Sequence, residues 1–285
     1  MKVVLSRKGV DTGNSKMSNL VITNNGKSKI VMIPIPSEKD KVSYKDLTFS
    51  NDKNVNFYTK EYIKVHNIRL NELKTKCHAD PNLSNYFNDS NFLGSIGQVG
   101  ISLSHLEKHN IKVGDIFIFF GRFSFMDLVN NQPKMREEDK HLLFGYLQVG
   151  EIIYPNKLTL NQRKEYEHKY PWIVNQPHWN MDKYKNQDNN CIYIASEKCS
   201  FDSSLCGYGT FNYDDALILT KENEPLSHWS LSCEVLKEEL SYHNKNNVKD
   251  NYFQSALRGQ EFVFTYNEKV KSWAENLIKK YGKRV

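Results

Sequence analysis

The sequence lacks several short motifs that identify common enzyme classes. It contains no GxxxxGK[ST] loop, no GxGxxG, no HExxH, no GxSxG and no HxE paired with PCxxC. Three glycines spaced GxxGxxG, at Gly94, Gly97 and Gly100, are too loosely arranged for a dinucleotide-binding turn. These absences argue against P-loop NTPases, Rossmann enzymes, zincins and zinc deaminases.

Cysteine is scarce, and none of the five cysteines belongs to a CxxC pair. An odd number of cysteines without such pairs is typical of reduced thiols in a cytoplasm. We therefore expect five free thiols and no tightly bound structural metal. Because the cofactor-binding motifs above are also missing, we expect no cofactor.

Long hydrophobic runs are missing as well. No stretch approaches eighteen apolar residues, and charged residues follow the apolar segment 3–5 almost at once. We therefore expect a cytoplasmic protein with neither a membrane span nor a signal peptide. The 39 basic and 33 acidic residues leave a net charge of +6, which mildly favours an anionic partner.

The residue pattern predicts more strands than helices. Strands are expected at 3–5, 20–23, 29–35, 191–195 and 216–220. The two strongest are expected at 113–121 and 142–150, and the polar loop over 128–140 suggests that they form an antiparallel pair. Helices are expected at 58–76, at 99–110, after the capping-box sequence Thr159-Leu160-Asn161-Gln162, and after Asn267.

These elements predict an α+β fold. We expect mainly an antiparallel, barrel-like sheet with flanking helices. No repeat of fixed period and no Pro/Ser-rich linker divides the chain, so we expect one domain over residues 1–285.

The first expected strand ends in two cations. Arg7 and Lys8 are followed by Gly9, and Asp11 comes two residues later. Cations and backbone N–H groups in such a segment can bind a phosphate, and Asp11 can bind a ribose or base donor. The alternative is an ordinary hairpin whose charges are solvated.

A histidine and an aspartate stand two residues apart in Cys77-His78-Ala79-Asp80-Pro81. They could form an acid–base pair or share a metal, for which His178 in Gln176-Pro177-His178 is the distant further ligand. The alternative is a turn, since Asp-Pro is a strong turn initiator.

Near the C-terminus, Arg258, Gln260 and Glu261 surround a glycine. Their side chains offer hydrogen bonds suited to a base edge or to the backbone of a partner. They could equally form a structural ion pair.

Together these segments resemble the third nucleotide-modification-associated domain family. The resemblance extends in order over nearly the whole chain and is carried by Ser6-Arg7-Lys8-Gly9 with Asp11, His78 with Asp80-Pro81, Gly97-Gln98, Gly114-Asp115 before an aromatic strand, 144–149, Pro177-His178 and 258–262. Val10 departs from the family pattern, which has a larger aromatic there, and this weakens a stacking role at that position. The resemblance implies a DNA-base-modification and phage or restriction context, without a defined reaction. A weaker similarity to PUA-like domains such as EVE and ASCH implies a small barrel that reads modified bases in an aromatic pocket.

Two functions from different classes remain open, and both imply a nucleotide or a nucleic acid with a modified base as partner. A binding module would use rings for stacking, cations for phosphate and polar groups for a base edge: Phe123, Trp172, Trp179; Arg7, Lys8; Gln98, Arg258, Gln260. An enzyme would draw acid–base groups or metal ligands from Asp11, His78, Asp80, His178 and Glu261. As a third possibility, the chain is an interaction protein whose motifs serve only the fold.

Overall fold

The computed structural model describes residues 1–11, 15–66, 75–87, 89, 91–130, 132–136, 138–184, 187, 189–256 and 259–285. Its α-helices are α1 (Lys53–His66), α2 (Gly100–Lys108), α3 (Leu160–Lys169), α4 (Met181–Tyr184) and α5 (Glu268–Tyr281). Its strands are β1 (Val3–Arg7), β2 (Asn19–Asn24), β3 (Lys27–Val31), β4 (Ile35–Pro36), β5 (Cys77–His78), β6 (Ser95–Val99), β7 (Ile116–Val129), β8 (Gln132–Met135), β9 (Lys140–Ile153), β10 (Asn190–Ala195), β11 (Lys198–Cys199), β12 (Asp202–Cys206), β13 (Tyr208–Thr210), β14 (His228–Trp229), β15 (Phe253–Gln254) and β16 (Glu261–Val263).

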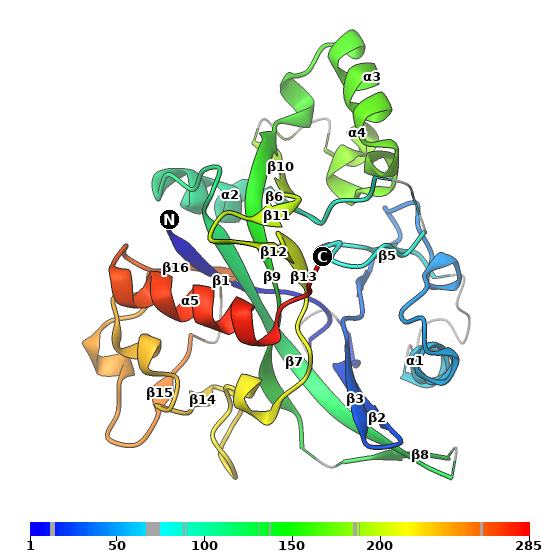
Figure 1. The fold of residues 1–285 in the computed structure, drawn as a ribbon. Coiled ribbons are helices and arrows are strands. Elements are labelled where there is room, and N and C mark those ends of the chain that lie inside the picture. The colour runs from blue at the N-terminus through cyan, green and yellow to red at the C-terminus, as the bar shows by residue number, and fades with distance from the viewer. Residues whose placement is uncertain are drawn as a thin grey trace.

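The fold is α+β, as predicted, and its sheet is built around the two long strands β7 and β9 (Figure 1). These strands pair antiparallel from Ile116 opposite Gln148 to Phe123 opposite Lys140, which confirms the predicted antiparallel pair. The sheet continues in the order β16-β1-β7-β9-β10-β6, with β2, β3, β8 and β13 attached to its sides.

The prediction of a mainly antiparallel barrel needs correction, because the sheet is mixed and curls only into a half-barrel. Both β1 and β2 run parallel to β7, one beside residues 116–120 and the other beside residues 123–128. Parallel neighbours require crossover connections, which here pass through α1 and α2. A residue pattern reports which face of a strand is buried and not its direction, so this feature was not predictable from alternation. A PUA-like fold is not confirmed.

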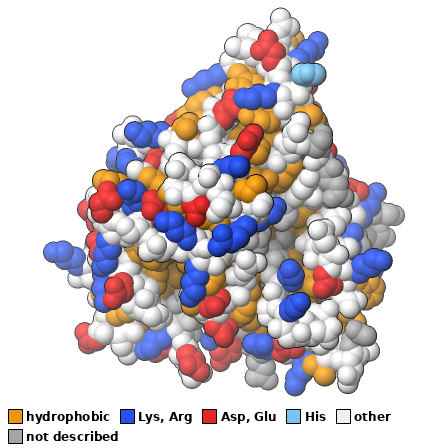
Figure 2. Space-filling view, in the orientation of Figure 1, with side chains coloured by type: hydrophobic (Ala, Val, Ile, Leu, Met, Phe, Trp, Pro, Cys, Tyr) orange, Lys and Arg blue, Asp and Glu red, His pale blue; other side chains and the backbone are white. Residues whose placement is uncertain are grey.

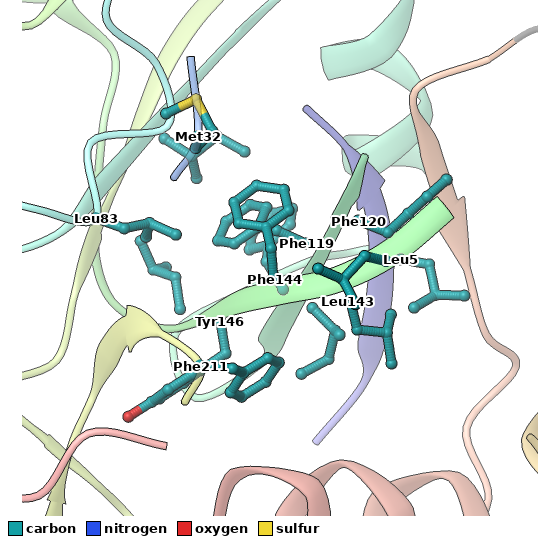
Figure 3. Packing of buried hydrophobic residues seen from close by; sticks show 14 of the residues in the cluster. Leu5, Met32, Leu83, Phe119, Phe120, Leu143, Phe144, Tyr146 and Phe211 are labelled. Carbon is teal, nitrogen blue, oxygen red and sulfur yellow. The ribbon is translucent and has the colours of Figure 1, made fainter. Parts of the chain in front are cut away.

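The interior is dominated by rings from the two long strands. Phe117, Phe119 and Phe120 are completely buried, so β7 is covered on both faces at this point. The ring of Phe119 stacks on that of Phe144 from β9, with centroids 5.9 Å apart (Figure 3). Aromatic pairs at this distance are worth about 0.5–1.5 kcal/mol beyond the area that they bury.

The helix termini follow the predicted capping residues. The Thr159 hydroxyl accepts a hydrogen bond from the Gln162 N–H, and the Gln162 side chain accepts one from the Thr159 N–H, so the capping box at α3 is confirmed. Asn267 caps α5 by accepting a hydrogen bond from the Val270 N–H at 2.8 Å. The inner face of α5 buries Val270, Ala274 and Ile278.

Several predicted elements have different bounds. The strand expected at 29–35 ends at Val31, and Ile35–Pro36 forms β4 instead. The helix expected at 58–76 is α1, which begins earlier at Lys53; residues 67–74 of that prediction lie outside the described residues. The expected loop at 128–140 contains β8, which pairs with β7. The strand expected at 216–220 is wrong, because Asp215–Leu217 forms a 3₁₀ turn that the Asp214 carboxylate caps.

Three further observations concern the cysteines, the helices and the surface charge. All five cysteines are free thiols, as predicted. None of the described helices has both the length and the apolar character that crossing a bilayer requires. Basic and acidic side chains are interspersed over the face seen in Figure 2, so the small net positive charge does not gather there into a basic stripe.

One buried histidine makes the stability of this fold depend on pH. Burial, assisted by the charges of Arg7 and Arg122, lowers the pKa of His141 to about 3, and its Nδ1 accepts a hydrogen bond from the Trp229 indole. An unfolded histidine titrates near 6.5. Between these values the unfolded chain binds a proton that the folded protein does not, so stability falls as the pH drops from about 6.5 towards 3, by up to roughly 1.4 kcal/mol per pH unit.

The variant His141→Asn removes this titration while offering an oxygen in place of Nδ1. We measure the free energy of unfolding by chemical denaturation at several pH values between about 3 and 6.5. In this variant we expect the slope of that free energy against pH to be smaller by close to one proton. The control is His168→Asn, since His168 is exposed on α3, and its slope should equal that of the parent protein. An unchanged slope in His141→Asn would contradict the assignment.

Candidate functional site

Residues from six separate parts of the chain line a cavity of about 440 Å³. Small-molecule sites span about 300–1,000 Å³, so a nucleobase or nucleotide is within its capacity. The structure brings eight of the predicted site residues to its walls: Arg7, Lys8, Asp11, His78, Asp80, Gln98, His178 and Gln260. Gly9, Ile35, Gly97, Val99, Tyr184 and Gly259 complete the lining.

Strand pairing explains this convergence. The antiparallel pairing of β1 with β16 places Ser6 opposite Glu261, so the residues flanking these positions lie together at one end of the strands. The pairing of β10 with β6 places Cys191 opposite Gln98. The segment after β5 is tied to β6 because the Asp80 carboxylate accepts a hydrogen bond from the Gly97 N–H at 2.7 Å.

His178 lies in a short 3₁₀ turn, Pro177–Trp179, and is held in one orientation by Asn190. The Asn190 amide nitrogen donates to the His178 carbonyl at 2.7 Å, which leaves its amide oxygen facing the ring, 2.8 Å from Nδ1. Nδ1 therefore carries the proton, and Nε2 presents a lone pair. Burial and the nearby charge of His78 lower the pKa of His178 well below its usual value, which keeps the ring neutral.

Asp80 is buried and accepts two hydrogen bonds at the same oxygen. Oδ1 accepts from the Gly97 N–H and from the Gln176 side-chain amide, each at 2.7 Å. Burial raises the pKa of Asp80, although the charges of His78 and Lys8 and these hydrogen bonds act in the opposite direction.

His78 lies beside a buried ion pair. Its Nδ1 is 3.2 Å from Asp40 Oδ2 and 3.0 Å from Lys183 Nζ, while Lys183 and Asp40 are 2.6 Å apart. Burial opposes the charge of Asp40, but hydrogen bonds from His78 and Lys183 outweigh it and lower the pKa of Asp40 to about 2. The Asp40 carboxylate is therefore available to orient the His78 ring.

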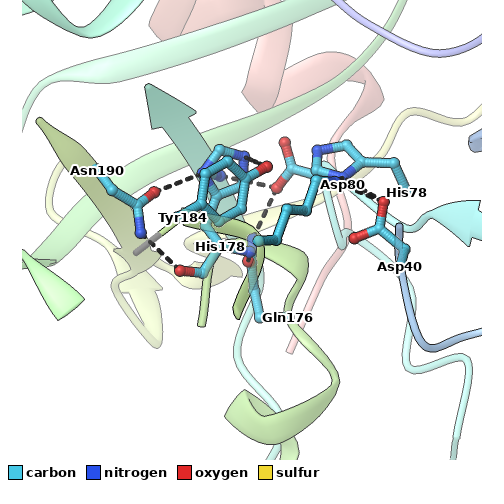
Figure 4. Close-up of polar contacts among 9 residues, drawn as sticks. Asp40, His78, Asp80, Gln176, His178, Tyr184 and Asn190 are labelled. Carbon is cyan, nitrogen blue, oxygen red and sulfur yellow. Dashed lines mark hydrogen bonds and ion pairs between the residues drawn. The ribbon is translucent and has the colours of Figure 1, made fainter. Parts of the chain in front are cut away.

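The three side chains form a compact cluster (Figure 4). The potential ligand atoms of His78, Asp80 and His178 all lie within 4.8 Å of one another, and the two imidazole rings meet edge to face with centroids 5.3 Å apart. Within the described part of the chain, no other group of three or more His, Cys, Asp or Glu side chains is so arranged. The Tyr184 ring stacks on His178, and its hydroxyl is 3.4 Å from Nε2.

In the predicted anion site, both cations already have partners within the protein. Lys8 forms an ion pair with Glu261 at 2.8 Å, and the two side chains are 8% and 1% exposed. The same Glu261 oxygen accepts hydrogen bonds from Ser6 and Gln98. The Arg7 guanidinium donates to the Ala256 carbonyl at 2.8 Å and lies over the Phe120 ring. Both cations line the cavity but are also bound within the protein.

Other predicted residues differ in position. The Gln260 side chain is exposed at the cavity, where it accepts a hydrogen bond from Ser102 at 3.4 Å. Glu261 lies beneath Lys8 and is 2% exposed. Arg258 lies outside the described residues.

The three rings predicted to stack on a base need correction, because they lie in the interior and not on the cavity wall. Phe123 is completely buried beside Phe144. Trp172 is 1% exposed and donates to the Asn91 carbonyl, and Trp179 is 4% exposed and donates to Glu167. Their indole N–H groups already have partners, and burial leaves no ring face for a ligand.

Sequence reasoning missed the residues that position the cluster: Asp40, Gln176, Tyr184 and Asn190. None belongs to a recognisable motif, and each meets its partner only through folding. The closest signal was Gln176-Pro177-His178, where Gln176 adjoins the predicted ligand.

Two larger hollows, of about 550 and 700 Å³, lie elsewhere on the protein. One is lined by residues that include Asn51, Asn85 and Tyr208, and the other surrounds the ion pair of Arg122 with Asp139. Among the described residues, neither hollow has three His, Cys, Asp or Glu side chains whose polar atoms come as close together as those of His78, Asp80 and His178, so the smaller cavity is the better candidate.

The family model of nucleotide modification associated domain 3 matches residues 2–265, nearly the whole chain. The chain belongs to this family. The resemblance read from the short motifs is thereby confirmed, and the family's description connects the protein with nucleotide modification. No curated protein and no solved structure matches the chain.

The position of His178 depends on the absence of a side chain at residue 97. A Cβ built on Gly97 would lie 2.1 Å from Cδ2 of the His178 ring, which is closer than real atoms approach. We expect Gly97→Ala to displace the ring and to cost about 1–3 kcal/mol of stability. The double variant Gly97→Ala/His178→Ala should be more stable than the sum of the two single changes predicts, because the removed ring makes room for the methyl group. Denaturant melts of the four proteins measure this coupling, and strict additivity would contradict the contact.

Proposed function

We propose that this member of the nucleotide modification family is an enzyme that acts on a nucleotide or modified nucleobase in the 440 Å³ cavity. The observation that carries the proposal is the convergence of His78, Asp80 and His178, which are up to a hundred residues apart in sequence, on one wall of this cavity. Clustered titratable groups with perturbed pKa values in a cavity are typical of active sites.

Each of the three side chains is held by a buried partner that does not itself have to react. Asn190 orients His178, Asp40 lies against His78, and Gln176 with the Gly97 N–H binds Asp80. A reactive group held by such a shell loses little entropy when the reaction begins. Neutral His178 directs the lone pair of Nε2 towards the cluster, where this atom can act as a general base if it is not bound to a metal ion.

The cavity is also lined by groups that suit a nucleotide. Arg7 and Lys8 provide positive charge where a phosphate would lie, and the exposed amide of Gln260 can pair with a base edge. Both cations also have partners within the protein, Lys8 the Glu261 carboxylate and Arg7 the Ala256 carbonyl, so a phosphate would share them with these groups.

A module that only reads bases is supported less well. Such modules stack the base on aromatic rings, whereas the predicted rings lie in the interior and the tyrosine that lines this cavity is already stacked on His178. The site therefore favours chemistry over recognition alone.

Turnover should depend on the Nε2 atom of His178. In His178→Asn the side-chain amide can keep the hydrogen bond to Asn190, but Nε2 is lost. We expect the rate to fall by about 10²–10⁴ while nucleotide binding is retained. The assay incubates the protein with common and base-modified nucleotides and oligonucleotides, and mass spectrometry detects any change in the base or phosphate. If the parent protein binds one of these compounds and leaves all of them unchanged, the binding-module alternative is correct.

Binding should depend on Arg7 and Gln260. Replacing either with Ala removes a hydrogen bond to the ligand worth roughly 1–3 kcal/mol, which lowers nucleotide affinity about five- to a hundredfold. Calorimetry with the best-bound compound measures the affinity, and melting curves measure the fold. Gln260→Ala should leave the melting temperature unchanged, because this side chain is exposed.

The control for lost charge is Arg284→Ala, since Arg284 is exposed near the C-terminus and does not line the cavity. Its affinity should equal that of the parent protein. If Arg7→Ala and Gln260→Ala both bind the nucleotide normally, this cavity is not where it binds.

A further inference from the structure

We propose that His78, Asp80 and His178 form a binding site for one divalent first-row transition metal ion. This inference deepens the proposed function, on which it rests for the role of the ion; binding of the ion itself requires no nucleotide. It reverses our expectation from the sequence that no metal would be bound.

The donor set is appropriate for such an ion. Two imidazoles and one carboxylate are the ligands of the facial sites that bind Fe²⁺, and the same donors also suit Zn²⁺. Three protein ligands leave further coordination positions open, and these would face the cavity that the three residues line. This arrangement is characteristic of catalytic sites, since purely structural sites are usually closed by four protein ligands.

The surroundings of each ligand provide the second argument. Metal-bound histidines almost always donate their other ring N–H to a carboxylate, carbonyl or amide oxygen, which directs the lone pair at the ion. His178 does so towards the Asn190 oxygen at 2.8 Å, and the Nδ1 of His78 lies 3.2 Å from Asp40 Oδ2. The remaining ligand, Asp80, is held at Oδ1 by the Gly97 N–H and the Gln176 amide.

Two neighbouring groups would have to accommodate the ion. Lys183 Nζ is 3.0 Å from the His78 Nδ1, but it is also 2.6 Å from Asp40 Oδ2, so the carboxylate can accept from both. The Tyr184 hydroxyl, 3.4 Å from the His178 Nε2, would be replaced there by the ion or would become a further ligand.

The geometry requires a small contraction of the site. Bonds of about 2.0–2.2 Å to one ion place ligand atoms roughly 3.0–3.5 Å apart, whereas these atoms lie within 4.8 Å of one another. Side-chain movements on the order of an ångström are therefore sufficient. When bound, the ion would act as a Lewis acid next to the nucleotide cavity.

The test titrates protein stripped with a chelator and exchanged into metal-free buffer. Co²⁺ is added under anaerobic conditions and followed by its visible absorption, and Zn²⁺ is added in a calorimeter. We expect one ion per chain and a raised melting temperature on binding, because the ion binds the folded state. No nucleotide is present, so this result is independent of the turnover and affinity experiments above.

The ligand variants are His78→Asn, Asp80→Asn and His178→Asn, which preserve the hydrogen bonds at Nδ1 or Oδ1 but remove the proposed ligand atom or its charge. Each should weaken metal binding at least a hundredfold. Asn190→Ala, which removes only the orienting group, should weaken it about ten- to a hundredfold. Melting curves of the metal-free proteins identify any variant that fails to fold, and the conclusion then rests on the variants that do fold.

The control addresses adventitious binding to surface histidines. His105 on α2 and His109, the residue that follows this helix, have ring centroids 4.5 Å apart, and such a pair can capture Zn²⁺ or Co²⁺. His109→Ala should leave the affinity and the stoichiometry unchanged. The proposal is overturned if the parent protein binds no stoichiometric ion, if binding survives in the folded ligand variants, or if His109→Ala abolishes it.

Discussion

The Asp80 carboxylate is the contact on which the arrangement of the site depends. Its Oδ1 accepts hydrogen bonds from the backbone of β6 and from Gln176, which begins the turn that carries His178. Through one buried oxygen, three segments distant in sequence are held together. A buried carboxyl group costs several kcal/mol when it lacks hydrogen bonds, so any movement that separates these segments is opposed by that cost.

The interior around this contact combines an aromatic core with a few buried polar networks. Rings of β7 and β9 fill the curled sheet, and the Glu261 carboxylate joins β16 to Ser6, Lys8 and Gln98 at one end of it. Such a buried ion pair adds little net stability compared with apolar residues, but losing one partner is costly. The network therefore serves mainly to hold the ends of β1, β6 and β16 in one arrangement, and these ends form part of the cavity wall.

The paired strands of the sheet and the groups proposed to react are consequently close to one another. Gly97 allows the His178 ring to lie directly against the backbone of β6, and Asn190, the first residue of β10, orients that ring. Both residues belong to strands that pair with each other, so the sheet itself sets the position of the imidazole. Membership of the nucleotide modification associated domain 3 family gives this site its biological context, and the positions of its side chains give the chemistry that we propose.

Local patterns were sufficient for much of the fold. The apolar periodicity of β7, β9 and α5 and the capping residues Thr159 and Asn267 act over a few residues, so the sequence by itself determined these elements, the α+β class and the free thiols. The short motifs also indicated His78, Asp80 and His178 as residues that could act together. Tertiary structure alone decided that β1 and β2 run parallel to β7, that Trp172 and Trp179 are buried, and that Asp40, Tyr184 and Asn190 surround the cluster. The physical reason is that strand direction, burial of a ring and the partner of a polar group all depend on contacts between residues far apart in the chain, which no local pattern encodes.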